Sequence, residues 1–281
     1  MVSKLNILRI ASFSQGETGG NPAGVLITES LPDPAEMQQI AADVGFSETA
    51  FACRDGDAWR VRYFSPESEV PFCGHATIAL GAALALREGD GIFPLVLNHA
   101  NITVEGHRNS DALTAALQSP PTSSQSPAPE LISEVMALFG YSADDLDPAI
   151  PPALVNGGAQ HFALTLNSRS ALASMKYDLS AGRSLMIREG WVTIILAFAE
   201  TPRLFHTRNP FASGGVYEDP ATGAATAAFA GYLRDLGWPH GGSIDIIQGE
   251  DMGMRSSLHA DIPQTPGSSI RVSGSARLMT A

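Results

Sequence analysis

The chain has few cysteines, a shortage of basic residues and no long apolar run, and each of these excludes a class of protein. Among 281 residues there are two cysteines, Cys53 and Cys73, too few for a disulfide framework. With 17 basic against 29 acidic residues, the net charge of −12 repels phosphate backbones and anionic membrane surfaces. The longest apolar runs, 78–86 and 191–199, fall well short of the ~20 residues that span a bilayer. We therefore expect a cytoplasmic protein that binds neither nucleic acid nor membrane.

The length and the hydrophobic content of the chain are sufficient for a well-packed protein of two domains. Hydrophobic residues make up 44% of the chain and charged residues 16%, a balance typical of a folded core. Strand-like and helix-like segments alternate irregularly, which indicates the α+β class. The segment 119–129, SPPTSSQSPAP, is rich in proline and serine, which is typical of a linker or an exposed crossover, and we predict a linker. The expected domains are 1–118 and 130–270, and we allow that the last residues return to the first domain.

An internal repeat supports this division. Residues 73–79, CGHATIA, match residues 222–228, TGAATAA, at Gly, Ala, Thr and Ala in register. Two alanine-rich helices could match by composition alone, but the glycine and threonine also agree. The repeat predicts two similar domains, each with a central buried helix, since alanine and glycine allow neighbouring elements to approach closely.

The repeat also suggests where a ligand binds. Each copy places a glycine, Gly74 or Gly223, in the first turn of its helix. The start of a helix has unpaired N–H groups and a partial positive charge. We therefore expect a small anionic metabolite, such as a carboxylate, in a cleft between the domains.

Three polar residues are candidates for acid–base chemistry. Glu48 lies in GFSETAF, and a carboxylate in such apolar surroundings can exchange protons near neutral pH. His75 could move a proton or bind substrate, and Asp219 could place a carboxylate at the second helix. Each also has a purely structural interpretation, as a strand-end residue or a helix cap.

Cys73 is a further candidate, because a helix N-terminus favours the thiolate. A racemase with two thiols would need a second cysteine in the other copy of the repeat, where Thr222 stands instead. Cys73 is therefore interpreted as a small packing residue, with its thiol kept as an alternative. The seven histidines are scattered without a metal-binding spacing, so no metal is predicted.

Taken together, these motifs resemble the phenazine-biosynthesis isomerase (PhzF-like) family. Five segments carry the resemblance, in family order: GGNPAGV (19–25), GFSETAF (45–51), RYFSPESEVPFCGHAT (62–77), GGVYEDPATGAA (214–225) and, more loosely, QGEDMGMRSS (248–257). The resemblance implies a diaminopimelate epimerase-like fold, in which two pseudo-symmetric domains each wrap a curved, mostly antiparallel sheet or barrel around a central helix. It also implies a homodimer and isomerase chemistry without a cofactor.

The resemblance assigns roles to residues of this chain. Glu48 becomes the acid/base, and His75 and Asp219 surround the reacting substrate. The substrate-binding residues implied by the same motifs are Asn21, Gly74, Gly223 and Ala224. The reaction of the family's namesake is the isomerisation of trans-2,3-dihydro-3-hydroxyanthranilate.

Three departures from the family pattern all lie in the second half. Ala224 stands where the family usually has serine, so one hydroxyl that would contact substrate is missing. Residues 211–213 read Phe-Ala-Ser instead of Phe-Ala-Pro, and residues 253–256 read Gly-Met-Arg-Ser instead of Gly-Arg-Pro-Ser. These changes leave the acid/base chemistry in place but put the namesake's substrate in doubt.

Three hypotheses follow. The first is a cofactor-independent isomerase or epimerase that acts on a small carboxylate-bearing metabolite through Glu48. The second is a racemase or epimerase that depends on Cys73. The third is a binding protein that kept the site after losing catalysis, which Ala224 would favour.

Overall fold

The computed structural model describes residues 6–109 and 112–280. The chain divides into two compact units: residues 1–118 together with 273–281, and residues 119–272. No helix in the described ranges is long and apolar enough to cross a membrane.

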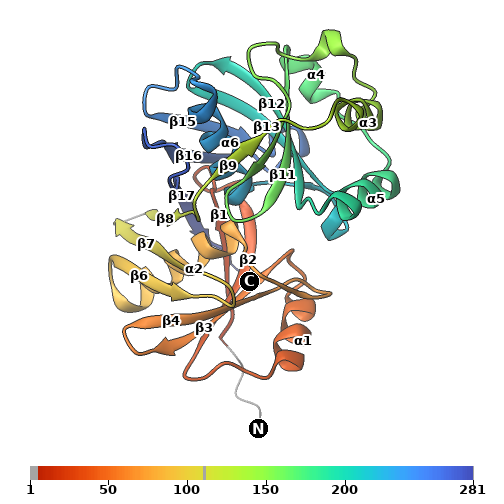
Figure 1. Cartoon of the computed structure of the whole chain (residues 1–281). Coiled ribbons are helices and arrows are strands. Elements are labelled where there is room, and N and C mark those ends of the chain that lie inside the picture. The colour runs from red at the N-terminus through yellow and green to blue at the C-terminus, as the bar shows by residue number, and fades with distance from the viewer. Residues whose placement is uncertain (1–5, 110–111, 281) are drawn as a thin grey trace. The chain divides into compact units, whose positions relative to one another are not determined.

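The first unit is a closed barrel around one helix (Figure 1). Its strands are β1 (Leu8–Ser12), β2 (Asn21–Thr28), β3 (Thr49–Asp55), β4 (Ala58–Phe64), β5 (Glu69–Val70), β6 (Gly91–Val96), β7 (Asn101–Asn109), β8 (Ala112–Gln118) and β17 (Arg271–Leu278). The ring runs β1-β2-β3-β4-β6-β7-β8-β17 and returns to β1, and β5 adds a short pairing to β4. The pairs β2–β3 and β4–β6 are parallel, whereas β1–β2, β3–β4, β6–β7, β7–β8 and β1–β17 are antiparallel.

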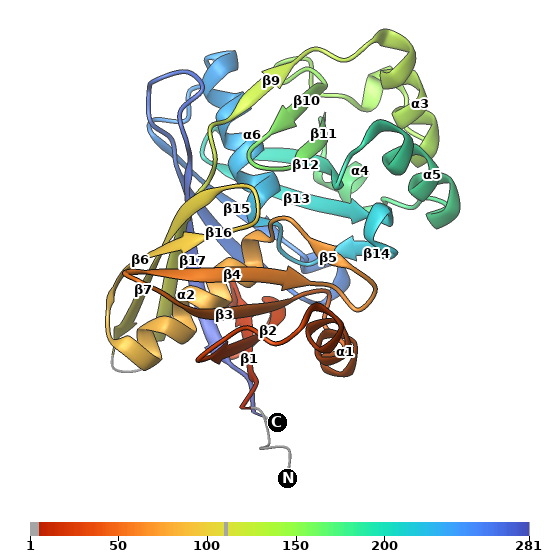
Figure 2. The ribbon, with the colours of Figure 1, turned by 60° about the horizontal axis from the view of Figure 1, so that its bottom comes forward.

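The helices of this unit differ in how they are buried. α2 (Gly74–Glu88) runs inside the barrel, and every residue from Gly74 to Ala85 is buried. Its alanines and Gly81 keep it thin enough for strands to surround it. α1 (Pro34–Val44) covers the outside of the sheet beside β3, as Figure 2 shows, and buries only one stripe. That stripe is Met37, Ile40, Ala41 and Val44.

The second unit has its own sheet around α6 (Gly223–Leu236). Its strands are β9 (Ser123–Gln125), β10 (Ala153–Asn156), β11 (Gln160–Leu166), β12 (Thr193–Thr201), β13 (Leu204–Phe211), β14 (Val216–Asp219), β15 (Ser243–Gln248) and β16 (Ser256–Asp261). Its other helices are α3 (Pro129–Phe139), α4 (Arg169–Ala173), α5 (Leu179–Glu189) and the short 3-10 turns η1 (Ala143–Asp145), η2 (Ala212–Gly214) and η3 (Glu250–Met252). Residues 223–234 of α6 are all buried.

The two units repeat the same connections. β10–β11–β12–β13 pair antiparallel, parallel and antiparallel, as β1–β2–β3–β4 do. A helical crossover precedes the parallel strand in each unit, α1 in the first and α4 with α5 in the second. The buried helix then follows a short antiparallel strand, β5 or β14. The strand after the buried helix then pairs in parallel, β6 with β4 and β15 with β13. The predicted α+β fold, with two pseudo-symmetric halves built around buried helices, is confirmed.

One prediction about the organisation is wrong. The segment 119–129 is not a linker, because it belongs to the second unit. β9 lies within it and pairs with β10, and Ser119 and Thr122 are buried. Thr122 sits against Gly231 of α6, where an added Cβ would come within 2.5 Å of its Oγ1. Proline and serine mark this segment as an edge strand packed on the helix. At the other end of the chain, residues 273–281 complete the barrel of the first unit through β17.

Candidate active site

Glu48 lies between α1 and β3. Gly45 ends α1 in a left-handed conformation, with φ +73°, and β3 begins at Thr49. The carbonyl oxygen of Glu48 already accepts a hydrogen bond from the amide of Gly24, at 3.2 Å. The backbone of Glu48 is therefore fixed by the sheet. Its side chain is turned inward and is part of a residue only 5% exposed.

His75 meets this carboxylate from the first turn of α2. Its Nε2 lies 3.4 Å from Oε2 of Glu48 and 3.4 Å from Oγ of Ser47. His75 is 4% exposed, and its carbonyl oxygen accepts a 2.7 Å hydrogen bond from the hydroxyl of Ser12 on β1. Strand β1 thus helps to hold the start of the helix on which the imidazole is carried.

Cys73 occupies the cap position just before α2. Its Sγ lies 3.3 Å from Nδ1 of His75, so the imidazole has the carboxylate at one nitrogen and the thiol at the other. The hydroxyl of Thr77 donates to the carbonyl of Cys73 at 2.7 Å, and the hydroxyl of Tyr63 contacts Thr77 at 2.6 Å. Burial raises the pKa of Tyr63, which keeps this hydroxyl protonated as a donor. The cap residue is therefore tied to the barrel wall.

The buried carboxylate of Glu48 differs from the other buried glutamate, Glu218, in its charged neighbours. Among the described residues, no arginine or lysine forms an ion pair with Glu48. The buried Glu218 of the second unit, by contrast, pairs with both ends of the Arg208 guanidinium at 2.9 and 2.5 Å. Among the described residues, the ionisable side chains next to the Glu48 carboxylate are thus an imidazole and a thiol and not a guanidinium or an ammonium group.

The same three side chains could hold a metal ion. One ligand atom each from Glu48, Cys73 and His75 all lie within 4.8 Å of one another, and all three residues are buried. Two further predicted residues belong to this unit. Gly74 is the first residue of α2, and Asn21, 2% exposed, lies opposite Ser12 in the β1–β2 pair.

The other predicted residues belong to the second unit. Asp219 ends β14, and its Oδ2 accepts a 2.6 Å hydrogen bond from the hydroxyl of Thr222, the cap residue of α6. Gly223 and Ala224 form the first turn of α6, and both are buried. The parts of Asp219, Gly223 and Ala224 in the reaction stay predictions.

Gln248 is the residue that sequence reasoning passed over. Its side-chain amide donates to the carbonyl of Asp219 at 2.7 Å and to the hydroxyl of Thr222 at 2.9 Å, while its Oε1 accepts from the amide of Thr222 at 3.0 Å. It therefore fixes both the aspartate and the helix start. Gln248 opens the last of the matching motifs, QGEDMGMRSS, and that was the available signal.

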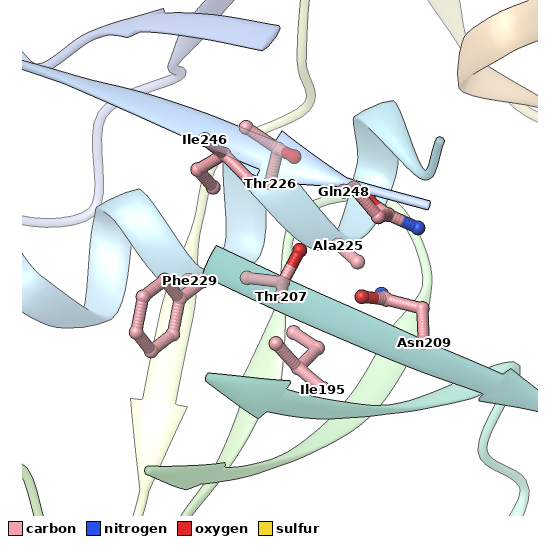
Figure 3. A pocket seen from close by; sticks show the side chains of 8 residues that line it. All are labelled: Ile195, Thr207, Asn209, Ala225, Thr226, Phe229, Ile246 and Gln248. Carbon is pink, nitrogen blue, oxygen red and sulfur yellow. The ribbon is translucent and has the colours of Figure 1, made fainter. Parts of the chain in front are cut away.

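A narrow pocket lies beside Gln248 within the second unit. Figure 3 shows its lining side chains: Ile195, Thr207, Asn209, Ala225, Thr226, Phe229, Ile246 and Gln248. Asn209 and Thr207 come from β13, and Ala225 and Thr226 come from α6. The buried Oδ1 of Asn209 has no hydrogen-bond partner among the residues that the structure describes. The inner face of this sheet is thus polar near the start of α6 and apolar further along it.

Comparison with known proteins agrees with this architecture. A family model described as phenazine biosynthesis-like protein matches residues 10–281. An uncharacterized isomerase of Pseudomonas aeruginosa is 32% identical over 82% of this chain and 81% of its own. The trans-2,3-dihydro-3-hydroxyanthranilate isomerase of Pseudomonas fluorescens is 28% identical over 91% and 89%. A solved structure of a predicted epimerase from Pseudomonas aeruginosa superposes with a TM-score of 0.85 at 25% identity, covering 99% and 98%.

A barrel in the first unit and a sheet in the second, each around a buried helix, are the fold that this chain shares with proteins named as isomerases and epimerases. The chain belongs to the phenazine biosynthesis-like (PhzF) family, as the match over nearly its whole length shows. Like its named relatives, it is an isomerase.

Proposed function

We propose that this isomerase works without a cofactor and moves a proton within a small carboxylate-bearing metabolite, with Glu48 as the acid/base. The observation that supports this most directly is the buried Glu48–His75 pair, 3.4 Å apart, with no arginine or lysine from residues 6–109 and 112–280 paired with the carboxylate. Glu48 would take a proton from one carbon of the substrate and return it to another, so the reaction needs no redox partner.

Groups around Glu48 suit this role. The first-turn amides of α2, from Gly74 on, are unpaired within the helix and would bind the substrate carboxylate. The hydroxyl of Ser47 and the imidazole of His75 add polar groups beside the Glu48 side chain. The site would thus bind the charged end of the metabolite close to the group that moves the proton.

The substrate is proposed only as a class. The similarity to a trans-2,3-dihydro-3-hydroxyanthranilate isomerase makes that compound the first to test. Ala224 lacks the hydroxyl that the resemblance places there, so we expect a different small carboxylate to be preferred.

A homodimer and a cytoplasmic location stay predictions. The homodimer comes from the family resemblance and the location from the composition. Light scattering tests the homodimer.

The test is solvent-proton exchange. Incubated with a panel of small carboxylates in deuterated water, the unmodified chain should incorporate deuterium into one of them. Glu48→Gln should lower the exchange rate at least about 100-fold, because general acid–base catalysis typically contributes that much. The exposed Glu36 on α1 offers a matched control, and Glu36→Gln should keep the rate. Exchange by Glu48→Gln at the unmodified rate would show that the assignment is wrong.

A second candidate is a Cys73-dependent epimerase, which the 3.3 Å contact between its Sγ and the His75 imidazole favours. Cys73→Ser separates the two. If Glu48 is the acid/base, exchange should fall by less than about tenfold; if the thiol is, exchange should fall as far as in Glu48→Gln. Cys53→Ser, at a half-buried cysteine on β3, controls for loss of a thiol elsewhere.

A further inference from the structure

We propose that Glu48, Cys73 and His75 also form an inhibitory binding site for a divalent metal ion of the Zn²⁺ class. The three ligands are a carboxylate, a thiol and an imidazole, the three donor types that Zn²⁺ takes from proteins. They come from two segments, the α1–β3 junction and the start of α2, and one atom from each lies within 4.8 Å of the others.

The distances are close to those that a metal complex requires. Zn²⁺ binds sulfur at about 2.3 Å and nitrogen or oxygen at about 2.0–2.2 Å, so neighbouring ligand atoms in a tetrahedral complex lie roughly 3.2–3.6 Å apart. The Nε2–Oε2 distance of 3.4 Å and the Sγ–Nδ1 distance of 3.3 Å already fall in this range. The two contacts use different nitrogens of His75, so binding requires Cys73 or Glu48 to rotate toward the same nitrogen. Ser47 Oγ or water would complete the coordination.

The charges also balance. A thiolate and a carboxylate together neutralise a dication, so the complex adds no net charge at the positive end of α2. Glu48 has no arginine or lysine partner among the described residues, so the ion would displace only its contact with the His75 imidazole. Because the three residues are only 4–8% exposed, water competes weakly for the ion.

Binding exchanges protons and leaves oxidation states unchanged. The Cys73 S–H bond breaks, its proton passes to solvent, and a metal–sulfur bond forms while the imidazole binds in its neutral form. Affinity should therefore fall as the pH is lowered. Hard ions such as Mg²⁺ prefer oxygen ligands and should not bind.

The inhibitory consequence rests on the proposed function of Glu48, whereas the binding does not. A metal ion on the Glu48 carboxylate would occupy the lone pair that accepts the substrate proton. Binding and inhibition are therefore measured separately, so failure of one is distinguishable from failure of the other.

The binding experiment uses Cd²⁺ as a probe of thiolate ligation. Titrating the chelator-treated full chain should produce a sulfur-to-cadmium charge-transfer absorption that saturates at one equivalent. Zn²⁺ should abolish the absorption by competition, and excess Mg²⁺ should leave it. Cys53→Ser should behave like the unmodified chain. Cys73→Ser should lose the band and weaken Zn²⁺ binding at least about 100-fold, and Glu48→Gln should weaken binding at least about tenfold. Cys73→Ala replaces the serine variant if circular dichroism shows that the latter is unfolded.

Several results would overturn the metal site. They are a full band in Cys73→Ser, loss of the band in Cys53→Ser, or no Zn²⁺ binding by calorimetry at micromolar concentration. Once a substrate is found, micromolar Zn²⁺ should suppress deuterium exchange by the unmodified chain, and a chelator should restore it. Tight binding without loss of exchange would confirm the site and remove its inhibitory role.

Discussion

At the scale of single residues, His161 shows how burial sets a proton equilibrium. It lies at 0% exposure on β11, with Nδ1 2.8 Å from the hydroxyl of Thr193 on β12, and its buried Nε2 has no hydrogen-bond partner in the part of the chain that the structure describes. Burial lowers the pKa of His161 to about 3, because the charged imidazole would lose its hydration. The folded chain therefore holds this side chain neutral over the whole physiological range.

This burial predicts a loss of stability in acid. In the unfolded chain a histidine has a pKa of about 6.5, so below that pH the unfolded state binds a proton that the folded state does not. Above about pH 6.5 neither state binds this proton, and His161 leaves the stability unchanged. As the pH falls from about 6.5 toward 3, proton binding to the unfolded state lowers the free energy of unfolding progressively. Between about pH 7 and pH 5, His161 should lower the free energy of unfolding by about 2 kcal/mol.

Urea unfolding at both pH values checks this. His161→Gln should flatten the pH dependence by that amount, whatever it does to stability at neutral pH. His99→Gln, at an exposed position, should leave it unchanged. Identical pH dependence in His161→Gln and the unmodified chain would contradict the prediction.

At the scale of elements, the packing of α2 in its barrel depends on two glycines. Gly81 on the helix and Gly106 on β7 face each other so closely that a Cβ on Gly106 would lie 2.1 Å from the carbonyl oxygen of Gly81. Alanine at either position would force the helix and the strand apart. Helix and strand are therefore in direct backbone contact at this point.

Gly106→Ala should accordingly lower the free energy of unfolding by about 1–3 kcal/mol, the usual range for overpacking. Gly91 provides a matched control, because it lies opposite Gly106 in the β6–β7 pair. An added Cβ there would meet nothing nearer than the Phe93 ring at 3.6 Å. Gly91→Ala should change stability by less than about 1 kcal/mol. Equal effects of the two substitutions in urea unfolding would show that the close contact between Gly81 and Gly106 does not determine the loss of stability.

At the scale of the whole molecule, the chain completes its first unit with its last residues. β17 pairs with β1 between Ile10 and Leu278, and the amide of Met279 donates to the carbonyl of Arg9 at 2.8 Å. β17 also pairs with β8, so it closes the ring of strands around α2. Each strand of the ring therefore pairs with a neighbour on both sides.

Removing residues 273–281 should therefore open this barrel. Trp59, 1% exposed, is the tryptophan of the first unit, and the other two, Trp191 and Trp238, belong to the second. The truncated chain should show increased acrylamide quenching of Trp59 and earlier unfolding in urea. A Trp59→Phe variant identifies its share of the fluorescence. Unchanged quenching of Trp59 would mean that the barrel does not depend on β17.

The local sequence was sufficient to predict part of the fold and part of the candidate site. Alanine, glycine and threonine repeated in register marked the two buried helices, because only small side chains suit a helix surrounded by strands. The GFSETAF and CGHAT motifs indicated Glu48 and His75 through the family resemblance. The proline-rich segment 119–129 was misjudged, because an edge strand and a linker share the same composition.

By itself, then, the sequence determined the fold class, the two buried helices and the family. Only the tertiary structure decided which groups meet. It brought Glu48 to 3.4 Å from His75, placed Cys73 at the other imidazole nitrogen and closed the first barrel with β17. The physical reason is that helix burial follows from neighbouring residues, whereas the Glu48–His75 contact and the β1–β17 pairing join segments that are apart in the chain and depend on strand register.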